Sequence, residues 1–516
     1  MKLERTKNAL RNILWGFVNK VITIVLPFIN RTIMIYLMGD QYVGLGSLFA
    51  SILSVLNLAE LGIGSALVYN MYKPIAEGDE DRICALMNFY KKCYRVIGLI
   101  VLGCGLVLLP FLQYLIKGSW PADINIYILY LMYLGQTVLS YNLYAYKNCL
   151  LKAHQRSDVT SKINMALNIG NMLLQMCILL STRNYYLYLA SGMLCNVALN
   201  LTQAYYVNKL YPQYECRGTL DRKTVAELKK KVTGLISSKI GGVVINSADN
   251  IVISAFLGLA VVGWYNNYFY ILSSIIGFLD IILWSLTAGI GNSIVTESVE
   301  TNHRNFNKFN FIYQWIVSWC SVCLLCLYQP TMSVWTPNGM FPFSIVCLLV
   351  FRFYAGRCVQ MTFAYKDAMG LWWEDKWRPI VSAVVNLTIN IILVKTIGIA
   401  GVIISTFVCS VFISTPWGNI VLFRNYFKEG LKEYFLSLGY NYLATFITCV
   451  ATYFICIQIP LSGVWAVLSR GIVCCIIPNI LMAALYFWTP MYRDSKDFVM
   501  NILNKGLARF KRTKQE

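Results

Sequence analysis

Charged side chains lie inside segments that are otherwise apolar enough to cross a membrane. Five of them are basic: Arg31, Lys20, Lys239, Arg352 and Arg357. A charge at the bilayer centre costs roughly 3 kcal/mol on insertion scales, so such residues usually have a functional role or reach water. Fixed cations along a passage of low dielectric constant would lower the barrier to an anionic substrate. We therefore predict that these five residues bind substrate in a cationic cavity.

Three carboxylates accompany the cations: Asp249, Glu60 and Asp280. Two roles are open for them, because they could neutralise the cations as buried pairs or bind a coupling ion, H⁺ or Na⁺. Both histidines, His154 and His303, fall in expected cytoplasmic loops. No constellation of nucleophile, base and orienting residue is visible, so no catalytic residue and no cofactor is predicted.

The cysteines give no clear chemical signal in the sequence. There are 17 of them, mostly within apolar segments, and an odd number gives no disulfide framework. Cys320, Cys323 and Cys326 have the spacing of metal ligands, but they lie in the middle of an apolar segment without histidine or carboxylate neighbours. The sequence therefore predicts no metal site.

The elements that must position these residues are membrane-spanning helices. Hydrophobic residues make up 57% of the 516, and charged residues 13%, far below the roughly 25% of a soluble domain. Apolar stretches of about 20 residues, each long enough to cross a bilayer as a helix, recur along the chain. They predict an all-α integral membrane protein with about 14 transmembrane helices, at 13–37, 42–69, 95–115, 124–146, 163–181, 185–207, 232–257, 261–295, 311–330, 341–363, 379–397, 400–423, 437–459 and 464–489.

The distribution of Lys and Arg predicts the orientation of these helices. If the N-terminus is cytoplasmic, the segments on its side carry 35 basic residues, and the opposite loops carry only Lys117, Arg183 and Lys395. This is a strong positive-inside pattern, which places both termini in the cytoplasm. It also explains the net charge of +20 without a nucleic-acid partner.

An internal repeat organises the chain. A shift of 219 residues aligns Gly39 with Gly258 and Gly44 with Gly263, and it pairs Lys20 with Lys239. Six spans per repeat predict two parallel halves with two helices added at the end. The predicted division is an N-lobe at 1–208, a cytoplasmic linker at 209–231, a C-lobe at 232–424, two additional helices within 425–489 and a basic cytoplasmic tail at 490–516.

Helical spacing places several of the polar residues on shared faces. Lys20 and Arg31 are eleven residues apart, so they project from one face with about 16 Å of rise between them. Asp280 is the last of three polar residues at intervals of seven, after Asn266 and Ser273. Such stripes are typical of helices that line a wet cavity. The alternative for Arg31 and Lys20 is that each long side chain extends to the nearest membrane surface.

Four stretches resemble a known family. They are "NRTIMIYLMGDQYVGLGSLFASILSVLNLAELGIGSALVYNMYKPIAEGD" (30–79), "SADNIVISAFLGLAVVGWYNNYF" (247–269), "DAMGLWWEDKWRPI" (367–380) and "GIAGVIISTFV" (398–408). Their order and spacing are similar to those of bacterial polysaccharide-biosynthesis membrane proteins, the O-antigen (Wzx-type) flippases of the MOP, or MATE-like, exporter superfamily. Arg31 matches the arginine of that family's "NR" pattern, and Asp249 matches the aspartate of its "DN" pattern.

The resemblance implies a MATE-like bundle of two lobes that works by alternating access. It implies transport of oligosaccharide repeat units linked to undecaprenyl diphosphate across the bacterial inner membrane, for O-antigen, capsule or exopolysaccharide. The implied partners are this lipid-linked substrate and membrane lipids, with a polysaccharide polymerase and glycosyltransferases beside them.

Three other functions compete with this one. A multidrug exporter of the same fold would favour an acidic cavity for cationic drugs, and a lipid II flippase would share the charge logic of the first hypothesis. A membrane-embedded polysaccharide polymerase is less well supported, because no outer loop exceeds about a dozen residues and no catalytic constellation is visible.

Overall fold

The computed structural model describes residues 22–60, 63–336, 338–498 and 500, and it contains helices but no strand within these ranges. The predictions that fall on Lys20, the N-terminal residues and most of the basic tail lie outside the described residues. The first α-helices are the one at Ile22–Met38, α2 (Asp40–Leu56), α3 (Ile63–Glu77), α4 (Glu80–Leu108), α5 (Ile126–Asn142), α6 (Asn148–Ala153), α7 (Ser157–Thr182), α8 (Tyr185–Leu210) and α9 (Arg222–Leu257).

The second half of the chain is also helical. Its α-helices are α10 (Leu259–Thr296), α11 (Val299–Trp335), α12 (Phe343–Arg357), α13 (Gln360–Ala368), α14 (Trp377–Ile397), α15 (Ile399–Val408), α16 (Thr415–Leu422), α17 (Leu431–Ile457) and α18 (Gly463–Tyr486). Shorter turns of 3₁₀-helix are η1 (Asn57–Glu60), η2 (Leu109–Leu115) and η3 (Ala145–Lys147). Two π-helical turns, η4 (Cys409–Ser414) and η5 (Phe423–Phe427), flank α16.

Side-chain caps fix where several of these helices begin. The carboxylate of Asp79 accepts the Arg82 backbone N–H at the start of α4, and Asp221 does the same for Thr224 at the start of α9. Asn125 and Asn184 cap α5 and α8. Each cap satisfies a donor that the helix itself leaves free, so the polar residues between apolar segments define the helix starts.

Nine helices within the described ranges are long and apolar enough to cross a membrane, and three shorter apolar helices accompany them, at Ile22–Met38, Asp40–Leu56 and Gly241–Leu257. Helices α5 and α8 coincide with two further predicted spans. The chain is therefore a multi-pass membrane protein, as predicted, and the count of about 14 spans stays a prediction.

The structure differs from the predicted span at 42–69, which is not one continuous helix. It is divided into α2, the 3₁₀ turn η1 and α3. Backbone that departs from the α-helix at membrane depth is tolerated where it is buried in protein or lines a cavity. The interruption places Asn57 and Glu60 on such a turn.

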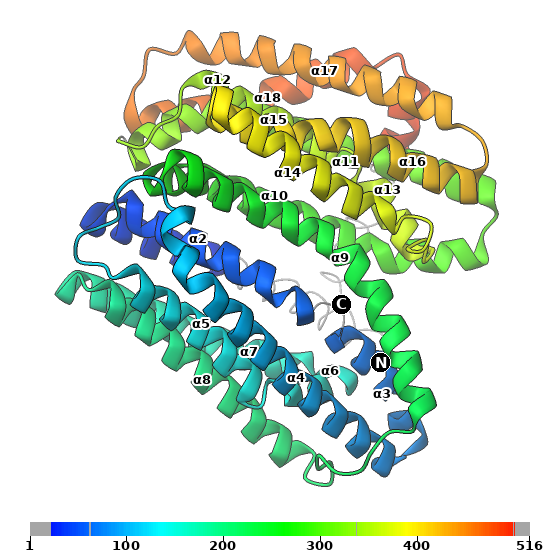
Figure 1. The fold of residues 1–516 in the computed structure, drawn as a ribbon. Coiled ribbons are helices and arrows are strands. Elements are labelled where there is room, and N and C mark those ends of the chain that lie inside the picture. The colour runs from blue at the N-terminus through cyan, green and yellow to red at the C-terminus, as the bar shows by residue number, and fades with distance from the viewer. Residues whose placement is uncertain (1–21, 61–62, 337, 499, 501–516) are drawn as a thin grey trace, which may run out of the picture. The chain divides into compact units, whose positions relative to one another are not determined.

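The chain divides into two compact units, Met1–Asn266 and Asn267–Glu516. In the first unit α7 packs on α8, α4 packs on α5, and α5 contacts α8, so these helices run side by side (Figure 1). Helix α9 packs against α2 in this unit. In the second unit α11 packs against α12, α17 and α18, and α14 packs against α15.

The internal repeat is visible in the backbone of the first unit. Gly39 precedes α2 with φ 100° and ψ 170°, and its repeat mate Gly258 precedes α10 with φ 95° and ψ 170°. Only glycine adopts this conformation readily. A Cβ added to Gly44 would lie 2.1 Å from the Leu259 carbonyl oxygen, and one added to Gly263 would lie 2.3 Å from the Asp40 carbonyl oxygen. Each of the two aligned glycines thus lies against a backbone carbonyl of the other repeat, Gly44 against that of Leu259 and Gly263 against that of Asp40.

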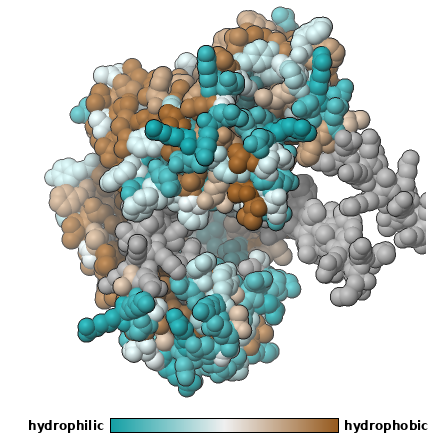
Figure 2. Space-filling view, turned by 90° about the vertical axis from the view of Figure 1, so that its right-hand side faces the viewer, coloured by the Kyte–Doolittle hydropathy of each residue, from teal (hydrophilic) through white to brown (hydrophobic). Residues whose placement is uncertain are grey.

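Large hydrophobic side chains cover much of the surface. On α18, Leu468, Ile472, Ile476 and Ile480 are all exposed at intervals of four, and they form one apolar stripe along the helix. Figure 2 shows hydrophobic residues gathered in broad areas, with hydrophilic residues concentrated elsewhere on the face in view. Apolar surface of this extent is what a protein presents to lipid.

Candidate functional site

A cavity of about 700 Å³ lies within the first unit. It lies among α2, η1, α3, α4, α5, α6 and α8, with Val243 of α9 also at its wall. Its lining is rich in hydroxyl and amide groups and contains two charged residues, Glu60 and Lys152. The polar lining residues include Ser54, Asn57, Tyr90, Tyr94, Tyr133, Gln136, Thr137, Ser140, Tyr141, Asn148, Asn196, Asn200 and Gln203.

Glu60 is held by tyrosine hydroxyls. Tyr94 donates to Oε1 of Glu60 at 2.5 Å, and Tyr141 donates to Oε2 at 2.8 Å. The Tyr90 hydroxyl donates in turn to that of Tyr94 at 2.8 Å. Both oxygens of the Glu60 side chain thus accept a hydrogen bond from a phenol hydroxyl.

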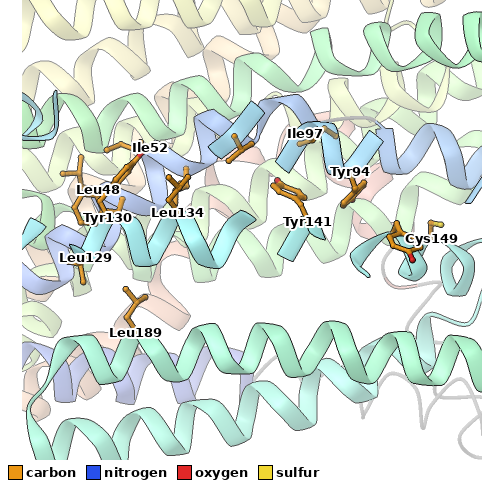
Figure 3. Close-up of a cluster of buried hydrophobic side chains, with 14 of the residues drawn as sticks. Leu48, Ile52, Tyr94, Ile97, Leu129, Tyr130, Leu134, Tyr141, Cys149 and Leu189 are labelled. Carbon is orange, nitrogen blue, oxygen red and sulfur yellow. The ribbon is translucent and has the colours of Figure 1, made fainter. Parts of the chain in front are cut away.

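Local features of four elements bring these groups together. The turn η1 ends α2 at the level where Glu60 enters the cavity. Tyr90 and Tyr94 are four residues apart on α4, so they share a face, and their rings meet edge to face with centroids 4.5 Å apart. Gly64 leaves room for this arrangement, because a Cβ there would lie 2.9 Å from the Tyr90 hydroxyl. Tyr94 and Tyr141 lie beside one another (Figure 3). Their ring centroids are 5.5 Å apart in an edge-to-face arrangement.

The remaining wall carries amides and one cation. Gln203 Nε2 donates to Asn164 Oδ1 at 2.9 Å, and the Thr160 hydroxyl donates to Asn148 Oδ1 at 3.2 Å. Lys152 lies on the short helix α6, one turn after Asn148, and its side chain is exposed. Amides and hydroxyls both donate and accept hydrogen bonds, so this wall can bind a ligand with many hydroxyl groups.

The structure brings Glu60 into this cavity, and Arg31 is not among its lining residues. Arg31 lies on the helix Ile22–Met38 and is half-buried. Its neighbour Asn30 is buried and donates to Gln175 Oε1 at 3.0 Å. Lys239 belongs to α9, but its side chain, like all of Lys20, lies outside the described part of the chain.

Asp249 is buried on α9 with 1% of its surface exposed. The Tyr265 hydroxyl donates to its Oδ2 at 3.1 Å. The next residue, Asn250, donates to the Ser51 hydroxyl of α2 at 2.9 Å and accepts a hydrogen bond from Asn266 at 2.8 Å. This polar contact joins α9, the first helix of the second repeat, to α2, the second helix of the first repeat. The "DN" pattern therefore has a packing role in this unit.

In the second unit Arg357 and Asp280 form an ion pair. A guanidinium nitrogen of Arg357 also lies 3.3 Å from the Tyr313 hydroxyl. Arg352, on the same helix, is 8% exposed, and its guanidinium carbon lies 5.8 Å from the centroid of the Phe269 ring. The pair is one of the two arrangements considered for Asp280, and the substrate-binding role of Arg357 stays a prediction.

Sequence reasoning missed most of the cavity. The tyrosines on α4 and α5 and Lys152 carry no motif, because they belong to segments whose apolar periodicity dominates. A signal was present in the i, i+4 pair Tyr90 and Tyr94 and in the amides Asn196, Asn200 and Gln203 on one face of α8. Whether these residues form a cavity depends on which helix faces pack together. The spacing of residues within one helix does not show this.

Comparisons with known proteins agree with this architecture. The solved structure of a multidrug resistance MATE family transporter of the MOP superfamily, in an inward-facing conformation, has a TM-score of 0.62 and 16% identity, and the match covers 79% of this chain and 95% of that one. The lipid II flippase MurJ has a TM-score of 0.60 and 15% identity, and the match covers 92% of this chain and 99% of that one. A mutant form of the Vibrio cholerae MATE transporter VcmN has a TM-score of 0.51 and 13% identity, and the match covers 80% of this chain and 95% of that one.

At such low identities these structures show the fold, which is MATE-like as predicted. A comparison with curated protein sequences finds no match. The family model described as "Polysaccharide biosynthesis protein" matches residues 9–332, more than half of the chain. The chain therefore belongs to the polysaccharide biosynthesis protein family, within the architecture shared by MOP-superfamily transporters.

Proposed function

We propose that the protein is a flippase for lipid-linked oligosaccharide repeat units, whose sugars enter the cavity around Glu60. The observation that supports this most is the cavity lining. In a membrane protein of a polysaccharide biosynthesis family, about 700 Å³ of space is walled by amides, hydroxyls and tyrosine rings. Drug-sized ligands usually occupy pockets that are mostly apolar, whereas sugars present hydroxyl groups that such a polar wall can bind.

The cavity lies toward the predicted cytoplasmic ends of its helices. Its wall includes Asn148 and Lys152 of α6, which follow the fourth predicted span on the side that carries the basic residues. A repeat unit assembled in the cytoplasm would meet this end first. Transport then proceeds by alternating access to the opposite leaflet of the bacterial inner membrane, with both termini in the cytoplasm.

The diphosphate of the carrier lipid needs cations near the cavity. Lys152 lines the wall itself. Arg31, Lys20 and Lys239 remain the proposed further contributors from the first unit, and Arg352 and Arg357 are proposed to meet the substrate within the second unit. The undecaprenyl tail stays in the bilayer. A guanidinium group can bind phosphate through two parallel hydrogen bonds, which suits Arg31 and Arg352 to this role.

Glu60 is the proposed site of ion coupling, with H⁺ or Na⁺ as the coupling ion. It is a carboxylate in a wet cavity, and its two phenol partners belong to a hydrogen-bonded network that would respond to protonation. The protein acts as a transporter and not as an enzyme, beside a polymerase and glycosyltransferases that supply and extend the repeat unit.

Deletion of the gene in the source strain tests this function. Surface polysaccharide should fall, and lipid-linked repeat units should accumulate in the membrane fraction and resist an added periplasmic glycosidase or pyrophosphatase until the membrane is permeabilised. Normal polysaccharide with raised drug sensitivity would instead identify a multidrug exporter. Arrested peptidoglycan synthesis with accumulated lipid II would identify a lipid II flippase.

Glu60→Gln tests the cavity, because it removes the charge and keeps the shape of the side chain. Complementation of the deletion strain should fall at least tenfold, while the protein remains in the membrane at the normal level. The matched control is Glu215→Gln, since Glu215 is exposed and lies outside the cavity lining. Equal complementation by both variants would overturn the role of Glu60.

A further inference from the structure

Three buried cysteines from three different helices converge in the second unit. Cys326 of α11, Cys456 of α17 and Cys474 of α18 are at most 1% exposed. Their sulfur atoms all lie within 4.8 Å of one another. Among the described residues this is the one group of His, Cys, Asp or Glu side chains close enough to hold a metal ion.

Further cysteines surround the trio. Cys323 lies one turn before Cys326 on α11, and its thiol is 4.0 Å from the Cys474 carbonyl oxygen. Cys449 lies two turns before Cys456 on α17 and belongs to the same buried cluster. Cys449 also lines an adjacent cavity of about 250 Å³.

The distances suit coordination by three sulfurs. A metal–thiolate bond is about 2.3 Å long, so three sulfurs around one ion in a plane stand about 4 Å apart. The trio therefore needs shifts of less than about 1 Å to close on an ion. Thiolates select soft metals, above all Cu(I) and zinc. We propose that Cys326, Cys456 and Cys474 form a binding site for a soft monovalent cation, Cu(I).

A small number of thiolate ligands keeps the charge of such a site low. Binding of Cu(I) to the three thiolates releases three protons to solvent and leaves a net charge of −2 at the ion. Arg470 lies four residues before Cys474 on α18, on the same side of the helix. Its Nε is buried and has no hydrogen-bond partner among the described residues. Its positive charge partly offsets that of the ion with its ligands.

Zinc fits the same residues less well. Structural zinc sites are almost always tetrahedral with four protein ligands. The trio supplies three, and a fourth would require Cys323 to turn away from the Cys474 carbonyl. A bound Cu(I) would instead need only these three sulfurs, after the small shifts described above, and would join the hairpin of α17 and α18 to α11.

Anaerobic titration with Cu(I) tests the proposal. The full-length protein is purified in detergent, reduced, desalted and titrated with Cu(I) in competition with bathocuproine disulfonate, a coloured Cu(I) chelator. The wild type should retain one equivalent of Cu(I) per chain, and X-ray absorption should show three sulfur neighbours at about 2.3 Å. Cys474→Ser should lose this equivalent.

The neighbouring residue provides the matched control. Cys475 is exposed, so Cys475→Ser should retain the bound copper. If Cys474→Ser fails to give a monodisperse protein, Cys456→Ser and Cys326→Ser take its place. The proposal is overturned if the wild type retains no copper, if the cluster variants retain the same equivalent, or if zinc is held as tightly. A disulfide among the three cysteines in protein that binds no copper would also overturn it.

Discussion

Substitutions in the ion pair between Arg357 and Asp280 can distinguish two roles of a buried cation, charge balance and substrate binding. Side chains of Arg357 and Asp280 are 11% and 35% exposed, respectively. Arg357→Ala leaves the carboxylate without its cation. Removing one partner of a fully buried pair costs about 3–5 kcal/mol. Because Asp280 keeps a third of its side-chain surface exposed, we expect a smaller loss of about 1–3 kcal/mol.

A double-mutant cycle measures the pairing directly. Arg357→Ala and Asp280→Ala should each lower the apparent melting temperature in detergent by several degrees and reduce complementation of the deletion strain. The double variant should recover most of both, because no unpaired charge remains. Arg424→Ala is the control, since Arg424 is exposed in the same unit.

Refutation would come from the double variant. If it melts like the wild type but complements no better than Arg357→Ala alone, then the guanidinium does more than balance Asp280. Arg357 would in that case be a substrate-binding cation, as the sequence first indicated. If the single variants melt like the control, the pair is not significant for stability.

Two further predictions concern the first unit. Gly44→Ala should destabilise the protein by about 1–3 kcal/mol in melting experiments, because the added Cβ would lie 2.1 Å from the Leu259 carbonyl oxygen. The control is Gly103→Ala, since no atom lies within 4 Å of a Cβ added there. This variant should be neutral or slightly stabilising. The ring of His154 stacks on Tyr211, and burial lowers the pKa of His154 from its usual 6.5. The unfolded chain therefore binds a proton at His154 more readily than the folded chain does. The free energy of unfolding should decline as the pH falls below about 6.5. His154→Phe should flatten this part of the melting profile between pH 8 and 5, and an unchanged profile would contradict it.

The sequence predicted the membrane class and the positions of most helices, because apolar length is a local property that each segment carries in its own residues. The repeat was also readable, since glycines at fixed spacing survive in both halves. The 3₁₀ turn η1, which lies between α2 and α3 within the predicted span at 42–69, was not predicted, because apolar length does not show where helical hydrogen bonding changes.

Partnerships between helices were much less predictable. Glu60 was identified as a polar residue in a span, but its partners Tyr94 and Tyr141 come from α4 and α5. Asp280 and Arg357 are likewise far apart in the chain. Hydrophobic periodicity reports that a face is buried and not which other face covers it, so such pairs emerge only from the three-dimensional packing.

The close contacts of Gly44 with Leu259 and of Gly263 with Asp40 have the symmetry of an isologous interface. In such an interface the same patch is used by both partners, so that residue i meets j and j meets i. Shifted by 219 residues, Asp40 aligns with Leu259 and Gly44 aligns with Gly263, so one contact is the image of the other. A chain of half this length would present both sides of the contact, and two copies of it could pair as a homodimer.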